Sequence, residues 1–169
     1  QDFYDRYDRT KSKVYLGEYA SWGNALYNAL AEAIYLTGVE RNGDVVAMTS
    51  YAPLLAKEKF TQWHTDLIYF NNTEVKPTVN YTVQQLYGNN AGDQYIESSI
   101  KLTDNKETVR KRVGASVVYD SQTGDYIVKL ANLLPVEVKT TVTIDGMGSA
   151  DTSAAMTQLT GKPGDRQAT

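Results

Sequence analysis

A glutamate that follows directly on a buried-strand pattern is the best placed side chain for chemistry in this sequence. The apolar run of residues 14–16 leads through Gly17 to Glu18. A strand covered on both faces is a continuous apolar run, and in α/β barrels the reacting groups lie at the carboxyl ends of strands. Gly17 would let a ligand approach the backbone closely. The pattern therefore places Glu18 where a catalytic carboxylate would lie, although capping of the following helix or pairing with an arginine is the commoner role of a charged residue at the end of an element.

The lack of cysteine and the single histidine limit the kinds of catalytic and metal-binding site that this chain can form. The 169 residues include no cysteine and one histidine, His64, so disulfides and thiolate sites are excluded and a histidine-built metal centre or catalytic triad is disfavoured. We expect no metal and no cofactor. The 17 basic and 20 acidic residues are spread along the chain, which indicates no nucleic-acid surface, and no apolar run is long enough to cross a membrane. Carboxylates remain, with 13 tyrosines and two tryptophans, whose flat faces suit sugar rings.

The elements that must position Glu18 are a strand, the turn after it and a helix. Helical spacing predicts one buried helix face, made by Leu26, Leu30, Ala33, Ile34 and Thr37. Gly38 is well placed to end this helix. The order strand, turn and helix makes one βα unit of a parallel sheet.

A second unit follows. Residues 44–52 fit either a helix or a strand, and we expect a short helix because Pro53 would disrupt a central strand. We predict a loop at residues 62–66, a buried strand at 67–70, and a helix that opens at 77–78 and stops at Gly88. Two such units cannot close a parallel barrel of eight. The first half is therefore expected to be a piece of a larger structure.

The sequence after residue 95 alternates with a period of two. Two strands are predicted on either side of a turn at residues 121–125, and one face of the second consists of Tyr126, Val128 and Leu130. Another alternating strand is predicted at residues 136–144. This pattern is typical of an antiparallel β-sandwich with one wet face per sheet. Tyr119 and Tyr126 share the apolar phase and are expected in its core, and the sandwich is expected to be truncated.

Four segments together resemble the α-L-arabinofuranosidases of glycoside hydrolase family fifty-one. The resemblance rests on residues 14–20, 29–42, 44–54 and 63–71. It implies an α/β plus all-β architecture. Residues 1–90 would be the end of a catalytic (β/α)8 barrel, its last strand–helix units, and residues 91–169 a truncated C-terminal antiparallel β-sandwich domain.

The resemblance also implies roles for particular residues. The family hydrolyses with retention, and the glutamate of this strand, here Glu18, is its nucleophile. Trp63 and Asp66 fall in the segment that reaches the sugar subsite, and Asp66 would accept hydrogen bonds from arabinose hydroxyls. Tyr19 and Tyr51 would supply hydroxyl donors. Packing is the alternative for both tyrosines, a loop cap is the alternative for Asp66, and His64 is expected on a surface loop.

The second carboxylate of the reaction has no counterpart here. Retaining hydrolysis needs two carboxyl groups about 5 Å apart, and the family's acid/base glutamate lies in an upstream Asn-Glu motif that this sequence lacks. We expect an exo-acting enzyme that removes terminal arabinofuranosyl groups from arabinose-containing polysaccharides or oligosaccharides. Its missing N-terminal part would be this chain's partner, and the chain alone would be inactive.

Other expectations stay open beside this one. The resemblance favours a secreted or periplasmic protein, and self-association into a homo-oligomer is left open. One rival class is a non-catalytic carbohydrate-binding β-sandwich module, which predicts a stripe of exposed aromatic side chains. The other is a different barrel glycoside hydrolase whose strand-end glutamate serves another substrate.

Overall fold

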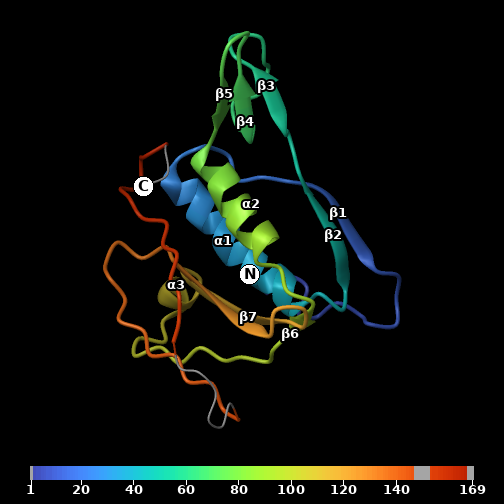
Figure 1. Cartoon of the computed structure of the whole chain (residues 1–169), viewed down its shortest axis with the longest axis vertical. Helices are drawn as coiled ribbons and strands as arrows, with labels where there is room; N and C mark the ends of the chain where they lie inside the picture. The colour runs from blue at the N-terminus through green and yellow to red at the C-terminus, as the bar shows by residue number, and fades with distance from the viewer. Residues whose placement is uncertain (1, 147–152, 167–169) are drawn as a thin grey trace.

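Two parallel strands and the helix between them form the first unit of the chain (Figure 1). The computed structural model describes residues 2–146 and 153–166. Strand β1 (Val14–Tyr19) leads into α1 (Leu26–Arg41) and then into β2 (Val46–Tyr51). Because β1 and β2 pair in parallel, their carboxyl ends meet at one edge. The predicted order of strand, turn and helix is confirmed, but α1 continues to Arg41, past the predicted stop at Gly38, and no residue of β1 is buried.

The short helix predicted at residues 44–52 is wrong, since most of this segment forms β2. Pro53 follows the last paired residue, Tyr51. A proline beyond the end of a strand removes no ladder hydrogen bond, so it does not argue against the strand before it.

A three-stranded arm projects from the helices, at the top of Figure 1. It consists of β3 (Leu55–Lys57), β4 (Ile68–Phe70) and β5 (Val75–Pro77), with β4 parallel to β3 and antiparallel to β5. The strand predicted at residues 67–70 is therefore present. It pairs in this arm rather than beside β1, and its side chains are half-buried rather than buried.

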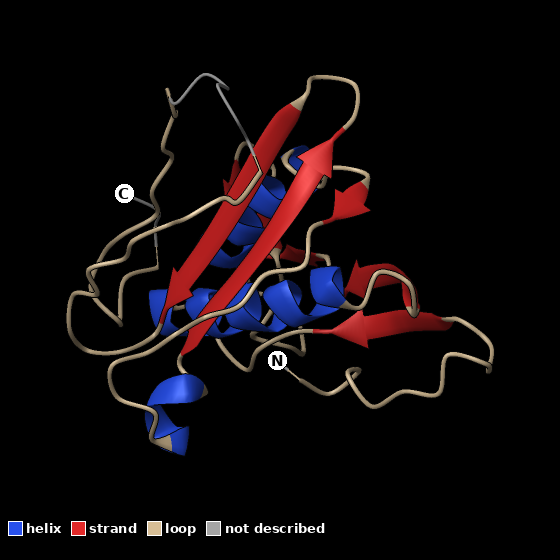
Figure 2. Cartoon of the chain, turned by 90° about the horizontal axis from the view of Figure 1, so that it is seen from below, coloured by secondary structure: helices blue, strands red, loops and turns tan. Residues whose placement is uncertain are grey.

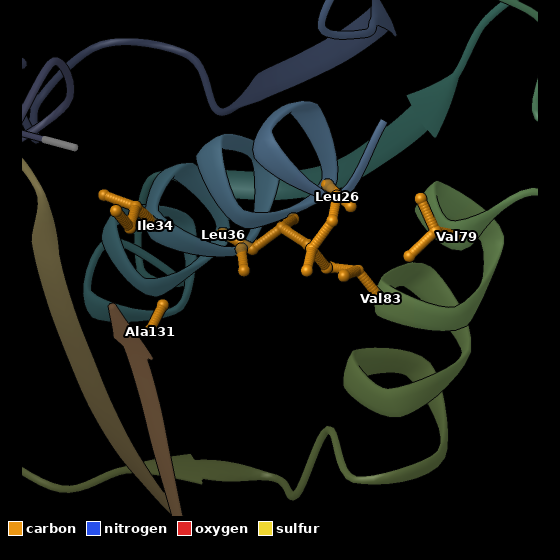
Figure 3. Packing of buried hydrophobic residues seen from close by; sticks show 8 residues of the cluster. Leu26, Ile34, Leu36, Val79, Val83 and Ala131 are labelled. Atoms are coloured by element: carbon orange, nitrogen blue, oxygen red, sulfur yellow. The ribbon is translucent and has the colours of Figure 1, made fainter. Parts of the chain in front are cut away.

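Helix α2 (Val79–Asn89) packs along α1. Thr78 is its N-cap and its hydroxyl accepts a hydrogen bond from the backbone N–H of Tyr81, which satisfies one of the free donors at the helix start. The predicted stop, Gly88, lies in the last turn. The side chains of the core point from α1, α2 and one strand toward one another (Figure 3), and they are Leu26, Ala29, Ala33, Ile34, Leu36, Val79, Val83 and Ala131.

The second half contains one antiparallel sheet. It runs β6 (Gln94–Tyr95), β7 (Val113–Asp120) and β8 (Asp125–Asn132), with a short helix α3 (Glu107–Arg110) before β7. The predicted hairpin is confirmed by the β7–β8 pairing. Its two long strands lie across helix α1 (Figure 2).

The face of this sheet that meets α1 is the opposite of the predicted one. Gly114, Ser116, Lys129 and Ala131 face the helix. The predicted apolar face points away, and its Tyr126 and Leu130 are exposed by 44% and 54%. The reason is steric: a Cβ added at Gly114 would lie 3.2 Å from the Cα of Ile34, so a larger residue does not fit at this point of closest contact between helix and sheet.

The strand predicted at residues 136–144 is absent, since this described segment forms no helix or strand. Its four alternating apolar residues, Val136, Val138, Val142 and Ile144, are between 36% and 62% exposed. The described residues after residue 90 thus form one sheet packed on α1, and they do not form the second layer of the predicted sandwich. The predicted domain extends to residue 169, and its residues 147–152 and 167–169 lie outside the described part.

The C-terminal segment returns to the start of α1. The backbone N–H groups of Leu26 and Tyr27 donate to the carbonyl oxygens of Asp165 and Pro163, at 2.7 and 3.1 Å. The segment thereby satisfies two of the N–H groups that a helix leaves free in its first turn. None of the described helices is long and apolar enough to cross a membrane.

Candidate active site

The end of β1 carries a bulge at the candidate catalytic carboxylate. Leu16 and Tyr19 are three residues apart in β1, whereas their partners in β2 are two residues apart. The burial pattern changes phase at the same point, because Gly17 and Glu18 are both exposed. Bulges re-aim side chains and are frequent beside active sites. Glu18 therefore lies on the surface next to the carboxyl end of its strand.

Gly17 has no steric role within this chain. A Cβ added there would lie 3.7 Å from the ring of Tyr15, which is ordinary van der Waals contact. Any need for glycine at this position would have to come from a group outside the chain, such as a ligand that approaches the backbone.

Tyr19 and Tyr51 turn their hydroxyls inward from the ends of β1 and β2. Tyr19 donates to Oε1 of Gln84 at 2.5 Å, and Tyr51 donates to Oε1 of Glu32 at 3.1 Å. The two rings meet edge to face, with centroids 5.6 Å apart. Burial and the nearby Glu32 carboxylate raise the pKa of Tyr19 to about 12, and burial raises the pKa of Tyr51 as well. Both hydroxyls are thus neutral donors, engaged inside the chain.

Trp63 and Asp66 lie in the same loop but in different surroundings. Trp63 is 54% exposed, and its ring lies 6.2 Å from that of Trp22, which is 83% exposed. Asp66 is only 1% exposed, and its Oδ2 accepts a hydrogen bond from Oγ1 of Thr61 at 3.3 Å. The carboxylate of Asp66 thus has a hydrogen-bond partner within its own loop. Trp22 was not singled out from the sequence, although it follows Glu18 by four residues in the loop after the strand.

No metal site is found at or near these residues. His64 is exposed in its loop, as predicted. Within the described ranges, no cluster of three or more His, Cys, Asp or Glu side chains is arranged to hold a metal ion.

A buried carboxylate lies at the centre of the polar contacts beneath the strand ends. Glu32 of α1 is 3% exposed. Its Oε1 accepts from the backbone N–H of Ser21 (2.9 Å), Tyr51 Oη (3.1 Å) and Asn80 Nδ2 (2.8 Å), and its Oε2 accepts from Gln84 Nε2 (3.4 Å). We call these five residues the Glu32 network.

Among the residues that the structure describes, no cation pairs with the carboxylate of Glu32. None of the ion pairs between described residues includes it. Burial raises the pKa of its carboxyl group, and the hydrogen bonds from the network oppose that rise. The sequence signal was available, because Glu32 lies three residues after Ala29 and four before Leu36, in the phase of the buried helix face.

Hydrogen bonds extend from the network to the loop of Trp63 and Asp66. Asn24 donates through Nδ2 to the Asp66 carbonyl oxygen at 3.1 Å and to Oδ1 of Asn80 at 3.3 Å. Its own Oδ1 accepts from the hydroxyl of Tyr69 at 3.2 Å. The structure thereby joins the loop after β1 and the loop before β4, which are more than 40 residues apart in the sequence.

Comparisons with known proteins give a consistent result. The family model described as the α-L-arabinofuranosidase C-terminal domain matches residues 17–169. An extracellular exo-α-L-arabinofuranosidase of Streptomyces chartreusis is 54% identical over 102 residues, which are 60% of this chain and 12% of that protein. A probable α-L-arabinofuranosidase A of Aspergillus terreus is 37% identical over 153 residues, which are 86% of this chain and 23% of that protein.

A solved structure agrees. The chain resembles an arabinose-bound α-L-arabinofuranosidase with a TM-score of 0.70 and 29% sequence identity, over 78% of this chain and 23% of the other. The chain thus spans less than a quarter of the length of each of these three proteins.

Proposed function

The chain belongs to the family of α-L-arabinofuranosidase C-terminal domains, and from this premise we propose that it supplies the nucleophile, Glu18, to a retaining exo-acting α-L-arabinofuranosidase. The substrates would be terminal α-L-arabinofuranosyl groups of plant polysaccharides or of their oligosaccharides. The observation that carries the proposal is the exposed carboxylate of Glu18, at a bulge beside the carboxyl ends of two parallel strands.

The proposed reaction has two steps. A carboxylate oxygen of Glu18 bonds to the anomeric carbon while the glycosidic oxygen leaves with a proton from the second carboxyl group. That group, now ionised, takes a proton from water, and the resulting oxygen attacks the anomeric carbon and releases Glu18. The second carboxyl group lies outside this chain, since the Asn-Glu motif that resembling enzymes carry is absent from the sequence.

The remaining part of the enzyme is therefore the proposed partner. Residues 1–90 would complete a (β/α)8 barrel whose earlier strands come from that part, and residues 91–169 would form the C-terminal β-domain. The bacterial relative is described as extracellular, which supports a secreted protein.

The test compares the isolated chain with the complete enzyme on an aryl arabinofuranoside. The complete enzyme is expected to turn over, and Glu18→Ala should lower its kcat by about 10⁴-fold or more, because a covalent nucleophile has no substitute in the site. The isolated chain should release no more aryl alcohol than its own Glu18→Ala variant. Turnover by the isolated chain well above that variant would refute the division of the site between two parts of the protein.

One observation favours a second candidate, a carbohydrate-binding module. Tyr119 and Tyr126 lie on the outer face of the β7–β8 hairpin with ring centroids 4.9 Å apart, and Tyr126 is 44% exposed. Neighbouring aromatic rings on an open sheet suit the apolar face of a sugar. Calorimetric titration of the chain with arabinose-containing oligosaccharides tests this candidate. Binding that disappears in Tyr126→Ala and persists in Glu18→Ala would favour the module.

A further inference from the structure

Glu32 has a position and an environment that the proposed reaction does not use. It is a buried carboxylate on α1, among Ala29, Ala33 and Leu36 of the apolar core. A buried charge without a cation is unfavourable by several kcal/mol unless hydrogen bonds replace its hydration. Here four donors surround it, and all four are neutral. An apolar side chain would fill this place in the core, so the carboxylate needs a reason beyond packing.

Two of the contacts of Glu32 hold the chain on the C-terminal side of Glu18. The first is direct, because the backbone N–H of Ser21, three residues after Glu18, donates to Oε1 at 2.9 Å. The second passes through Gln84, whose Nε2 donates to Oε2 of Glu32 and whose Oε1 accepts from the hydroxyl of Tyr19, the residue next to Glu18. The bulged end of β1 is therefore fastened to α1 and α2 at two points.

These contacts need an acceptor at both carboxylate oxygens. The amide of Gln84 presents its oxygen to Tyr19 and its nitrogen to Glu32. A glutamine at position 32 would keep the volume but could place an NH₂ group opposite the NH₂ group of Gln84. Gln84 could then restore this hydrogen bond by turning its amide, but its NH₂ group would face Tyr19, whose hydroxyl would have to accept instead of donate.

We propose that Glu32 is a positioning residue for Glu18: as an anionic acceptor inside the core, it fixes Ser21 and, through Gln84, Tyr19, and so aims the exposed carboxylate at the end of β1. The inference rests on the proposed function, in which Glu18 attacks the sugar. Glu32 itself does not touch the substrate. Small displacements of a reacting group are costly, since a shift of about 1 Å can lower a rate by about 10²-fold.

The experiment uses the complete enzyme with two variants, Glu32→Gln and Gln84→Met. Each alters the hydrogen bonds that connect Glu32, through Gln84, to Tyr19. Glu40→Gln is the matched control: Glu40 lies on the same helix, and its side chain is only 15% exposed, but its partners are Ser116 and Lys129 on the sheet. Steady-state kcat and KM, and the single-turnover release of the aryl alcohol, are measured well below the unfolding midpoint of each variant.

Glu32→Gln and Gln84→Met are expected to lower kcat and the single-turnover rate by about 10- to 100-fold, with KM changed by less than about threefold. Glu40→Gln should remain within about twofold of the wild type. A Glu32→Gln enzyme as fast as the wild type, or a Glu40→Gln enzyme as slow as Glu32→Gln, would overturn the inference, since either result would leave Glu32 with only a general structural role.

Amide hydrogen exchange supplies a readout that needs no turnover. The amide of Ser21 should exchange about tenfold faster or more in Glu32→Gln than in the wild type and in Glu40→Gln, because its hydrogen bond opens locally. Unchanged exchange of the Ser21 amide would show that Glu32 does not hold the end of β1, whatever the kinetic results. A wild-type enzyme without turnover would instead refute the proposed function, and with it the catalytic role of Glu32, while the exchange data would still decide whether Glu32 holds the strand end.

Discussion

Helix α1 carries one buried carboxylate, Glu32, and one partly buried carboxylate, Glu40, and their surroundings differ. Glu32 faces the ends of β1 and β2 and accepts only from neutral groups. Glu40, two turns later, faces the sheet, where it pairs with Lys129 of β8 and accepts from the hydroxyl of Ser116 in β7 at 2.5 Å. Lys129 also lies over the ring of Tyr87, 5.1 Å from its centroid. The last turn of the helix thus holds a balanced ion pair, and its middle holds an unbalanced charge.

The difference separates two uses of a buried charge. An ion pair can be replaced by apolar side chains of similar volume with little loss of stability, so the Glu40–Lys129 pair acts as a joint between helix and sheet. The charge of Glu32 has no such replacement, because an apolar side chain in its place would leave four donors from four different residues without an acceptor. This contrast agrees with a positional role for Glu32 near Glu18.

The largest effect on stability is expected from Glu32→Ala. The change leaves four donors without their acceptor and opens a cavity, so the free energy of unfolding of the chain should fall by about 3–5 kcal/mol. Denaturation in urea measures this value. Glu32→Leu should recover little of the loss, because filling the volume satisfies none of the donors. A Glu32→Leu chain as stable as the wild type would show that an apolar side chain can replace Glu32. Glu32 would then not differ from Glu40 in this respect.

The Glu40–Lys129 ion pair, unlike Glu32, should be replaceable by apolar side chains. Lys129→Ala leaves the carboxylate of Glu40 uncompensated and should lower the free energy of unfolding by about 3 kcal/mol. The double variant Glu40→Leu with Lys129→Met should return to within about 1 kcal/mol of the wild type. Urea denaturation of the single and double variants gives the coupling. A double variant as unstable as Lys129→Ala would show that apolar side chains cannot replace this ion pair.

Gly114→Ala tests the close contact between α1 and β7. At this contact the face of the sheet that meets the helix is the opposite of the predicted one. The added Cβ would lie 2.9 Å from Oγ1 of Thr37 and 3.2 Å from the Cα of Ile34. Such overpacking should cost about 2 kcal/mol in the free energy of unfolding. Gly88→Ala, whose Cβ would meet nothing within 4 Å, is the control and should not destabilise the chain. Equal effects of both changes would show that α1 and β7 are less closely packed than described.

The smallest effect concerns pH. Because the pKa of Glu32 is raised above 4.5 in the folded chain, the folded state binds this proton more tightly than the unfolded state. The stabilisation from protonated Glu32 is therefore complete below about pH 4.5 and is lost as the pH rises through the raised pKa. Tyr19, with a pKa of about 12, stays neutral throughout this range.

Thermal unfolding of the wild type and of Glu32→Gln at several pH values measures this linkage. The stability of the wild type relative to Glu32→Gln should decrease from about pH 4 to about pH 7. A relative stability that increases over this range would mean that the network favours the ionised form more than burial disfavours it. The charge of Glu32 would then be as well balanced as that of Glu40.

Much of the local structure could be predicted because it depends on neighbours in the sequence. The apolar run of β1, the helical spacing of α1 and α2, and the alternation of β7 and β8 each satisfy a backbone geometry with a fixed period. Glu18 could be singled out for the same reason, since it ends such a run. Trp63 and His64 were placed in a loop by the lack of any period.

The wrong predictions concern segments whose structure depends on contacts with distant parts of the chain. The outer face of β8 contains Tyr126 and Leu130 because α1 needs the small Gly114 and Ala131 opposite it. Residues 136–144 alternate like a strand, but a strand also needs a neighbour for its backbone hydrogen bonds. Residues 46–51 form β2 because β1 offers that neighbour, whatever proline follows.

Glu32 was overlooked because the helix face was recognised by its apolar members alone. The order of residues establishes that a carboxylate lies in the buried phase of α1. It cannot establish that Ser21, Tyr51, Asn80 and Gln84 will surround it, since they come from separate elements up to 52 positions away. Periodicity is a property of the chain and is written in its sequence, whereas the satisfaction of a buried charge is a property of packing and exists once the chain has folded.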